Sequence, residues 1–163
     1  MDSNGNLVFF GGVHGVGKSY LKSFLASQIE GACDISASRL LDWKSDCKHV
    51  ESCSSMEYNQ RILSSRILAA KSECRLTLLD GHFCLMLKDG SFSYVGDDIF
   101  MEIKPALIIC VVSEAATIAN RILQRDGTCF PTHVIETLQQ MEISYSQRAA
   151  EISNSPLIIF NNK

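Results

Sequence analysis

The sequence predicts an α/β fold in which helices cover both faces of a parallel β-sheet. Four short apolar runs, at 7–10, 76–79, 107–112 and 157–160, show no alternation with polar residues. Such runs are typical of strands that are buried on both faces. Helical patterns lie between them, as in repeated β-α-β units, and a chain of 163 residues without a linker or internal repeat is expected to form one domain.

The first half of the chain contains two predicted crossover helices and one further strand. Apolar residues recur at helical spacing in 20–29 and in 61–70, so each segment presents one apolar face. A fifth strand is predicted at 32–35, where the apolar signal is weaker. This order places a helix after the first strand and another before the run at 76–79.

The second half of the chain contains a predicted hairpin and two more helices. The turn residues at 88–90 lie between short apolar segments, which indicates a small hairpin insertion outside the sheet. Ser113 is predicted as the N-cap of a helix that ends at Asp126, before Gly127. A last helix is predicted over 134–152, and it leads into the strand at 157–160.

Composition and charge exclude several classes of protein. Hydrophobic residues make up 46% of the chain and the formal net charge is −3, which argues against a disordered chain and against broad nucleic-acid binding. The apolar runs are too short to span a membrane, and no export signal is recognised, so a soluble cytoplasmic protein is expected. The seven cysteines, with no C-x-x-C pair, are expected to be reduced thiols.

A phosphate-binding motif follows the first predicted strand. Residues 12–19 read GVHGVGKS and satisfy G-x-x-x-x-G-K-[ST], the Walker A pattern. Glycines let the backbone N–H groups and the helix N-terminus approach phosphate, so ATP is the expected ligand. Lys18 is expected on the β- and γ-phosphates and Ser19 on Mg²⁺, while His14 is expected to act through its backbone N–H. The predicted ATP-binding residues of this loop are Gly12, Val13, His14, Gly15, Val16, Gly17, Lys18 and Ser19.

An aspartate at the end of the strand at 76–79 is the predicted partner of this motif. Asp80 has the position of a Walker B residue and is expected to hold Mg²⁺ together with Ser19. The alternative is that Asp80 only caps a turn. Gly81 stands where motor ATPases usually carry a glutamate, and no N-K-x-D tetrapeptide is present to read guanine. These features favour a small P-loop kinase.

The order of GVHGVGKS, ISASRLL, LLDGH, RILQRD and SQRAA resembles that of the nucleoside monophosphate kinases, above all the archaeal-type adenylate kinases and kindred small ATP-binding proteins. The resemblance implies a nucleotide-kinase-like P-loop NTPase fold over 1–163. This fold is a three-layer α/β/α arrangement with a five-stranded parallel sheet, to which this chain would add a small hairpin insertion and a short lid. It also implies transfer of the γ-phosphoryl group of ATP to a nucleoside monophosphate.

Three arginines resemble the lid and post-lid arginines of these kinases. Arg121 and Arg125 lie four residues apart, hence on one helix face, within a lid expected at about 121–132. Both are candidate catalytic residues with Lys18 and Asp80, and Arg121 is also a candidate ATP ligand. Arg148 resembles the arginine that reaches back to the phosphates. The alternative for all three arginines is a solvated position on a helix.

The candidate acceptor-binding segment spans about 35–63. Residues 35–42 read ISASRLLD and resemble the family segment ISTGDLLR, but Ala37 replaces the threonine and Asp42 replaces the last arginine. Gln60 has the position of the glutamine that reads the acceptor base, and His82 follows a strand end beside the phosphate site. The candidate acceptor-binding residues are Ser36, Arg39, Gln60, His82 and Arg148.

The sequence therefore predicts an ATP- and Mg²⁺-dependent phosphotransferase whose acceptor is a nucleoside monophosphate. The substitution at Asp42 leaves open an ATP-binding regulatory module that turns over slowly or not at all and acts through a protein partner. A kinase with a small non-nucleotide acceptor is also compatible with the sequence, because a fold does not dictate its acceptor.

Overall fold

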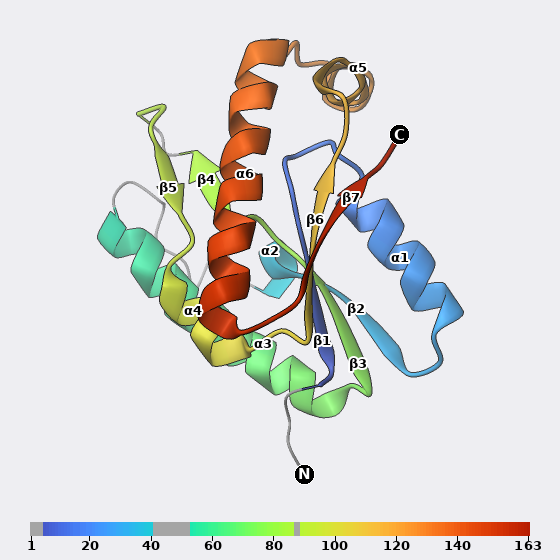
Figure 1. The fold of residues 1–163 in the computed structure, drawn as a ribbon, viewed down its shortest axis with the longest axis vertical. Helices are drawn as coiled ribbons and strands as arrows, with labels where there is room; N and C mark the ends of the chain where they lie inside the picture. Colours follow the sequence, from blue (N-terminus) through green and yellow to red (C-terminus); the bar gives the residue numbers. More distant parts are fainter. Residues whose placement is uncertain (1–4, 41–52, 87–88) are drawn as a thin grey trace.

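The computed structural model describes residues 5–40, 53–86 and 89–163, with the backbone alone at 53–57 and 86. Its centre is a parallel five-stranded sheet in the order β2-β3-β1-β6-β7, shown in Figure 1. The strands are β1 (Leu7–Gly11), β2 (Ala32–Ser36), β3 (Leu76–Asp80), β6 (Leu107–Val112) and β7 (Leu157–Asn161). All four predicted runs are strands, and the weaker signal at 32–35 corresponds to β2.

Helices cover both faces of the sheet. The helices are α1 (Lys18–Gln28), α2 (Ala37–Leu40), α3 (Cys53–Glu73), α4 (Asp97–Ile103), α5 (Ala115–Asp126) and α6 (Thr132–Ser153). Side chains of α3, α4 and α6 share one core cluster with β1, β3 and β6, while α1 lies on the opposite side in Figure 1. No helix within the described residues is long and apolar enough to cross a membrane.

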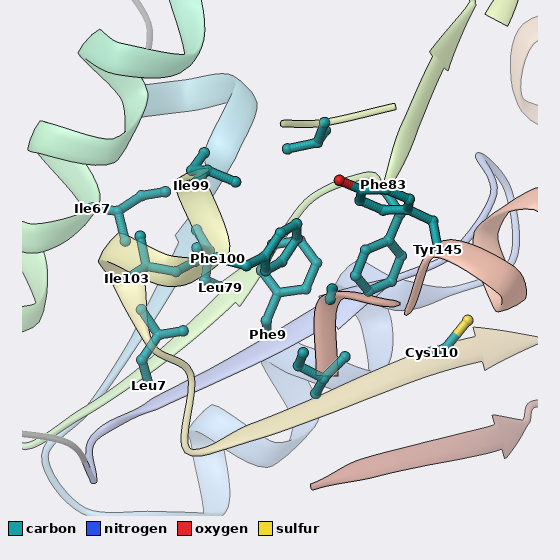
Figure 2. Close-up of a cluster of buried hydrophobic side chains, with 13 residues drawn as sticks. Leu7, Phe9, Ile67, Leu79, Phe83, Ile99, Phe100, Ile103, Cys110 and Tyr145 are labelled. Carbon is teal, nitrogen blue, oxygen red and sulfur yellow. The ribbon is translucent and has the colours of Figure 1, made fainter. Parts of the chain in front are cut away.

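Aromatic rings pack the helical layer against the central strand, β1. Phe9 of β1 lies 5.1 Å from the ring centroid of Phe83 and 5.2 Å from that of Phe100 in α4. Tyr145 of α6 adjoins the same group, as Figure 2 shows. Aromatic pairs at these separations stabilise the fold by more than the area they bury. The cluster therefore stabilises the packing next to the end of β3.

The predicted hairpin is present and lies outside the central sheet. Strands β4 (Cys84–Met86) and β5 (Phe92–Tyr94) pair antiparallel as a separate two-stranded sheet. The ring of Tyr94 stacks on Tyr145 at 4.8 Å, which holds the hairpin against α6. Lys88 of the predicted turn lies outside the described residues.

Two details of the sequence prediction are wrong. Cys33 and Cys74 form a disulfide, because the pairing of β2 with β3 brings their Cα atoms to 6.0 Å. Cys84, Cys110 and Cys129 are free. The N-cap of α5 is Glu114, not Ser113, whose hydroxyl instead donates to the carbonyl of Asn162 at 2.7 Å, beyond the end of β7.

Candidate active site

The Walker A loop connects β1 to α1 at the carboxyl edge of the sheet. Its backbone has positive φ at Gly12 (137°), Gly15 (83°) and Gly17 (100°), a region that L side chains rarely adopt. A side chain at Gly12 would also collide with the carbonyl oxygen of Val111. Gly17 is the N-cap of α1, so the loop delivers the free N–H groups of the helix start to the site.

Lys18 is folded onto its own loop. Its side chain is buried, and Nζ donates to the carbonyl oxygens of Gly12 and Val13, the second at 3.0 Å. Burial lowers the pKa of Lys18 to about 8, although the negative charges of Glu142 and Asp80 oppose that shift. The ammonium group therefore stands beside the phosphate cradle with carbonyl partners that a phosphate can replace.

Ser19 and Asp80 bring two oxygen donors together. The Ser19 hydroxyl donates to Asp80 Oδ2 at 3.4 Å, and Asp80 is buried at the last position of β3, in register with Phe10 of β1. Hydroxyl and carboxylate oxygens are ligands that suit Mg²⁺, so the pair fits the metal. The described ranges contain no group of three or more His, Cys, Asp or Glu that could hold a metal by itself.

A cavity of about 460 Å³ opens over the loop and is strongly cationic. Four basic side chains line it, against a single carboxylate, so it suits a polyanion such as a nucleotide polyphosphate. The lining residues are His14, Gly15, Gly17, Lys18, Ser19, Tyr20, Ser36, Ser38, Arg39, Asp80, His82, Arg121 and Arg125.

The two predicted lid arginines lie on this cavity. Arg121 donates to the carbonyl of Val16 at 3.1 Å, and Arg125 pairs with Asp126 at 2.7 Å. Arg125 also contacts the imidazole of His14, which lies 3.3 Å from Asp126. The sequence predicts that only the backbone N–H of His14 takes part in the site. In the structure, the His14 side chain also links the phosphate loop to the end of α5.

A second cavity, of about 180 Å³, borders the first. Its lining is mainly apolar and comes chiefly from β1, α2, α3, α4 and the β3–β4 connection. The residues are Phe9, Ser36, Ala37, Ser38, Asn59, Gln60, Leu63, Ile67, Asp80, Gly81, His82, Leu85, Val95, Ile99, Phe100 and Ile103. Four residues, Ser36, Ser38, Asp80 and His82, line both cavities, so the two cavities meet at the end of β3.

Gln60 lines the apolar cavity and carries a buried donor without a partner in the described part of the chain. Its Oε1 accepts the backbone N–H of Gly96 at 3.0 Å, while its buried Nε2 has no hydrogen-bond partner among the residues described. A buried donor without a partner is costly, and a ligand in this cavity can satisfy it.

The other acceptor candidates are only partly brought together. Arg39 of α2 lines the cationic cavity with Ser36, whose hydroxyl lies 3.1 Å from that of Ser38. Asp42 lies outside the described residues. Arg148 lines neither cavity. Its side chain pairs with Asp97 of α4, with an Nε to Oδ1 distance of 3.0 Å, because its face of α6 is turned toward α4.

Solved structures share this architecture at low sequence identity. The chain aligns over 98% of its length with 90% of TT1252 from Thermus thermophilus, with a TM-score of 0.57 and 12% identity. It aligns over 99% with 87% of a shikimate kinase from Acinetobacter baumannii in complex with shikimate, with a TM-score of 0.60 and 11% identity. The chain therefore has the same fold as these two structures. The predicted fold class is confirmed, while these matches support no narrower assignment to the adenylate kinases.

No family model matches the chain. None of the curated proteins matches it either.

Sequence reasoning missed a buried carboxylate behind the P-loop. Glu142 of α6 is 1% exposed and accepts the backbone N–H groups of Gly12 at 2.9 Å and of Phe83 and Cys84 at 3.2 Å. Its Oε1 lies 3.8 Å from His82 Nδ1. Burial raises the pKa of Glu142, but His82 and the backbone donor outweigh burial and hold the pKa below its usual range. The sequence feature that could have revealed this carboxylate is a glutamate within the apolar stripe of a predicted helix.

Proposed function

We propose that the protein is an ATP- and Mg²⁺-dependent phosphotransferase that transfers the γ-phosphoryl group of ATP to a nucleoside monophosphate. The observation that carries this proposal is the meeting of a cationic cavity and an apolar cavity at Asp80 and His82. A kinase requires two ligands to meet at one point, whereas an ATPase requires only a nucleotide and water. In this proposal 1–163 act as one domain, with a lid at 121–132 and an acceptor segment at 35–63.

The cationic residues act mainly by position and charge. Phosphoryl transfer requires little covalent help, so groups that neutralise the transferring phosphoryl supply most of the rate. Lys18 leaves the loop carbonyls for the phosphates, and Arg121 and Arg125 approach from the end of α5. Ser19 and Asp80 hold Mg²⁺, which, when bound, neutralises phosphate charge.

The geometry of the second cavity supports a nucleotide acceptor. An aromatic base fits an apolar cavity, and Gln60, which lines it, has an amide donor without a partner among the described residues. The acceptor phosphate then extends toward the shared edge, where Arg39 lines the neighbouring cavity. In this proposal the acceptor's phosphate lies near the γ-phosphoryl group of ATP, as in-line transfer requires.

A non-nucleotide acceptor is the second candidate, and one observation favours it. Among the described residues, no lysine or arginine lines the apolar cavity. A small alcohol with an apolar body needs no such cation, and one solved structure with this fold is a shikimate kinase in complex with shikimate. The regulatory module that acts through a protein partner differs from both candidates in having no acceptor.

A coupled assay of ADP release from Mg·ATP separates these functions. The assay uses a panel of nucleoside monophosphates, a panel of small alcohols and no acceptor, and compares wild type with Lys18→Ala. Lys71→Ala is the matched control, because Lys71 is also buried but lines neither cavity and donates to the carbonyl of Ile103. Acceptor-stimulated release that is lost only in Lys18→Ala supports a kinase and identifies its acceptor. Binding of ATP without any stimulation supports the regulatory module, and failure to bind ATP refutes the proposed function.

A further inference from the structure

A second lysine of α1 is buried beneath the phosphate loop and is not part of the Walker A motif. Lys22 lies one helical turn after Lys18 and is 2% exposed. Its Nζ donates to Asp80 Oδ1, to Asp34 Oδ1 at 2.7 Å and to the carbonyl of Ile35 at 2.6 Å. An ammonium group has three N–H donors, so every donor of Lys22 has a partner.

This arrangement divides the carboxylate of Asp80 between two neighbours. Oδ1 accepts from Lys22, and Oδ2 accepts from the Ser19 hydroxyl at 3.4 Å. The ion pair is buried, because the side chain of Lys22 is 3% exposed and that of Asp80 is 11% exposed. Only the oxygen on the Ser19 side is therefore directed at the place where a nucleotide-bound metal would lie.

The charges beside the metal position also balance before any ligand binds. The positive charge of Lys22 offsets one of the two carboxylates it contacts, Asp80 and Asp34, and the charge of Lys18 also attracts Asp80. Free Mg²⁺ keeps its water unless anionic oxygens replace it, and the two nearby carboxylates, Asp80 and Asp34, are both paired with Lys22. A buried cation next to a metal ligand reduces the attraction for a second cation.

We propose that Lys22 is a positioning residue that gives Asp80 a permanent positive partner, so that Mg²⁺ enters with the nucleotide and the nucleotide also binds without the metal. This inference rests on the proposed nucleotide site and concerns only how that site handles the metal. It assigns the two lysines different roles: Lys18 binds the phosphates, and Lys22 neutralises the carboxylate of Asp80.

The wild-type protein provides the first test. Its melting temperature is measured with MgCl₂ alone, and its dissociation constant for ATP is measured by calorimetry with Mg²⁺ and with EDTA. We expect no rise in melting temperature with MgCl₂ alone, and an ATP affinity in EDTA within about tenfold of that in Mg²⁺. A rise with MgCl₂ alone, or a loss of more than about tenfold in EDTA, overturns the inference.

Lys22→Met tests the residue itself, with Lys71→Met as the control for loss of a buried ammonium. In Lys22→Met, Asp80 and Asp34 lose their shared cation. We expect MgCl₂ alone to raise its melting temperature and removal of Mg²⁺ to weaken ATP binding by more than about tenfold. Lys71→Met should keep the wild-type behaviour. Equal metal dependence in Lys22→Met and wild type overturns the inference.

The outcome does not depend on a single variant folding. If Lys22→Met does not fold, the wild-type measurements can still overturn the inference, and Lys22→Arg, which keeps the charge, should show the wild-type metal dependence. The inference can fail while the proposed function stands, because ATP then binds and only its metal dependence differs. If wild type does not bind ATP under either condition, the proposed function and the inference built on it fail together.

Discussion

The disulfide between Cys33 and Cys74 allows a quantitative prediction. It joins Cys33 in β2 to Cys74, which lies two residues before β3, across a sequence separation of 41 residues. In the chain-entropy model, closing a loop of that length stabilises the fold by about 4 kcal/mol, because the unfolded chain loses freedom. For a chain of 163 residues, each kcal/mol corresponds to a few degrees, so reduction should lower the melting temperature by about 8–16 °C.

Thermal and urea unfolding, each with and without a reductant, measure this effect. Cys33→Ser should lose the same stability as the reduced wild type and should no longer respond to the reductant. Cys129→Ser is the matched control, since Cys129 is a free, exposed cysteine. A digest prepared without reduction should contain the peptide pair joined through Cys33 and Cys74.

The loop closed by the disulfide also contains α2 and α3, which line the apolar cavity. We therefore expect reduction to raise the KM for the acceptor more than the dissociation constant for ATP, because the described residues of this loop contribute only Ser36, Ser38 and Arg39 to the cationic cavity. The reasoning is refuted if the joined peptides are absent, or if reduction shifts the stability by less than about 1 kcal/mol, which is far below the loop-closure value.

Two further predictions concern residues beside the cavities. Gln60→Leu removes the free amide donor and should raise the acceptor KM about tenfold with little change in ATP affinity, as measured by steady-state kinetics. Glu142→Gln should cost about 1–3 kcal/mol at neutral pH in urea unfolding, because an amide cannot accept all the N–H groups that the carboxylate accepts. Because the pKa of Glu142 is depressed in the folded state, its stabilising contribution is present above about pH 4 and is lost as the pH falls further. Glu142→Gln should therefore flatten the acid side of the plot of stability against pH. Glu136→Gln, an exposed change on the same helix, should leave that side unchanged. An unchanged acid side in Glu142→Gln would contradict a stabilising role for the Glu142 carboxylate.

Local signals in the sequence account for most of the fold. Each of β1, β3, β6 and β7 contains a continuous apolar run, whereas the run in β2 is interrupted by Asp34. The glycine spacing of 12–17 imposes the loop backbone. The hairpin was found from its turn residues. The short helix α4 was not predicted, because its seven residues bury only Ile99, Phe100 and Ile103 and give no extended helical period.

The site was less predictable, because its contacts depend on which strands lie side by side. Cys33 and Cys74 meet only because β2 pairs with β3, and a sequence without a C-x-x-C pattern does not reveal that pairing. Arg148 matched a family position, yet the neighbouring α4 supplies Asp97 as its partner. Glu142 was visible in the sequence only as a charge on an apolar helix face.

The two buried lysines of α1 show why a motif alone does not define such a site. Lys18 is held by carbonyl oxygens, and burial lowers its pKa to about 8, so a phosphate that offers negative charge can draw it away from the loop. Lys22 is held by two carboxylates and a carbonyl, so exchanging these partners for a phosphate would leave the buried carboxylate of Asp80 without its cation. One lysine is therefore free to follow the nucleotide while the other is fixed in the protein, although both lie on the same helix one turn apart.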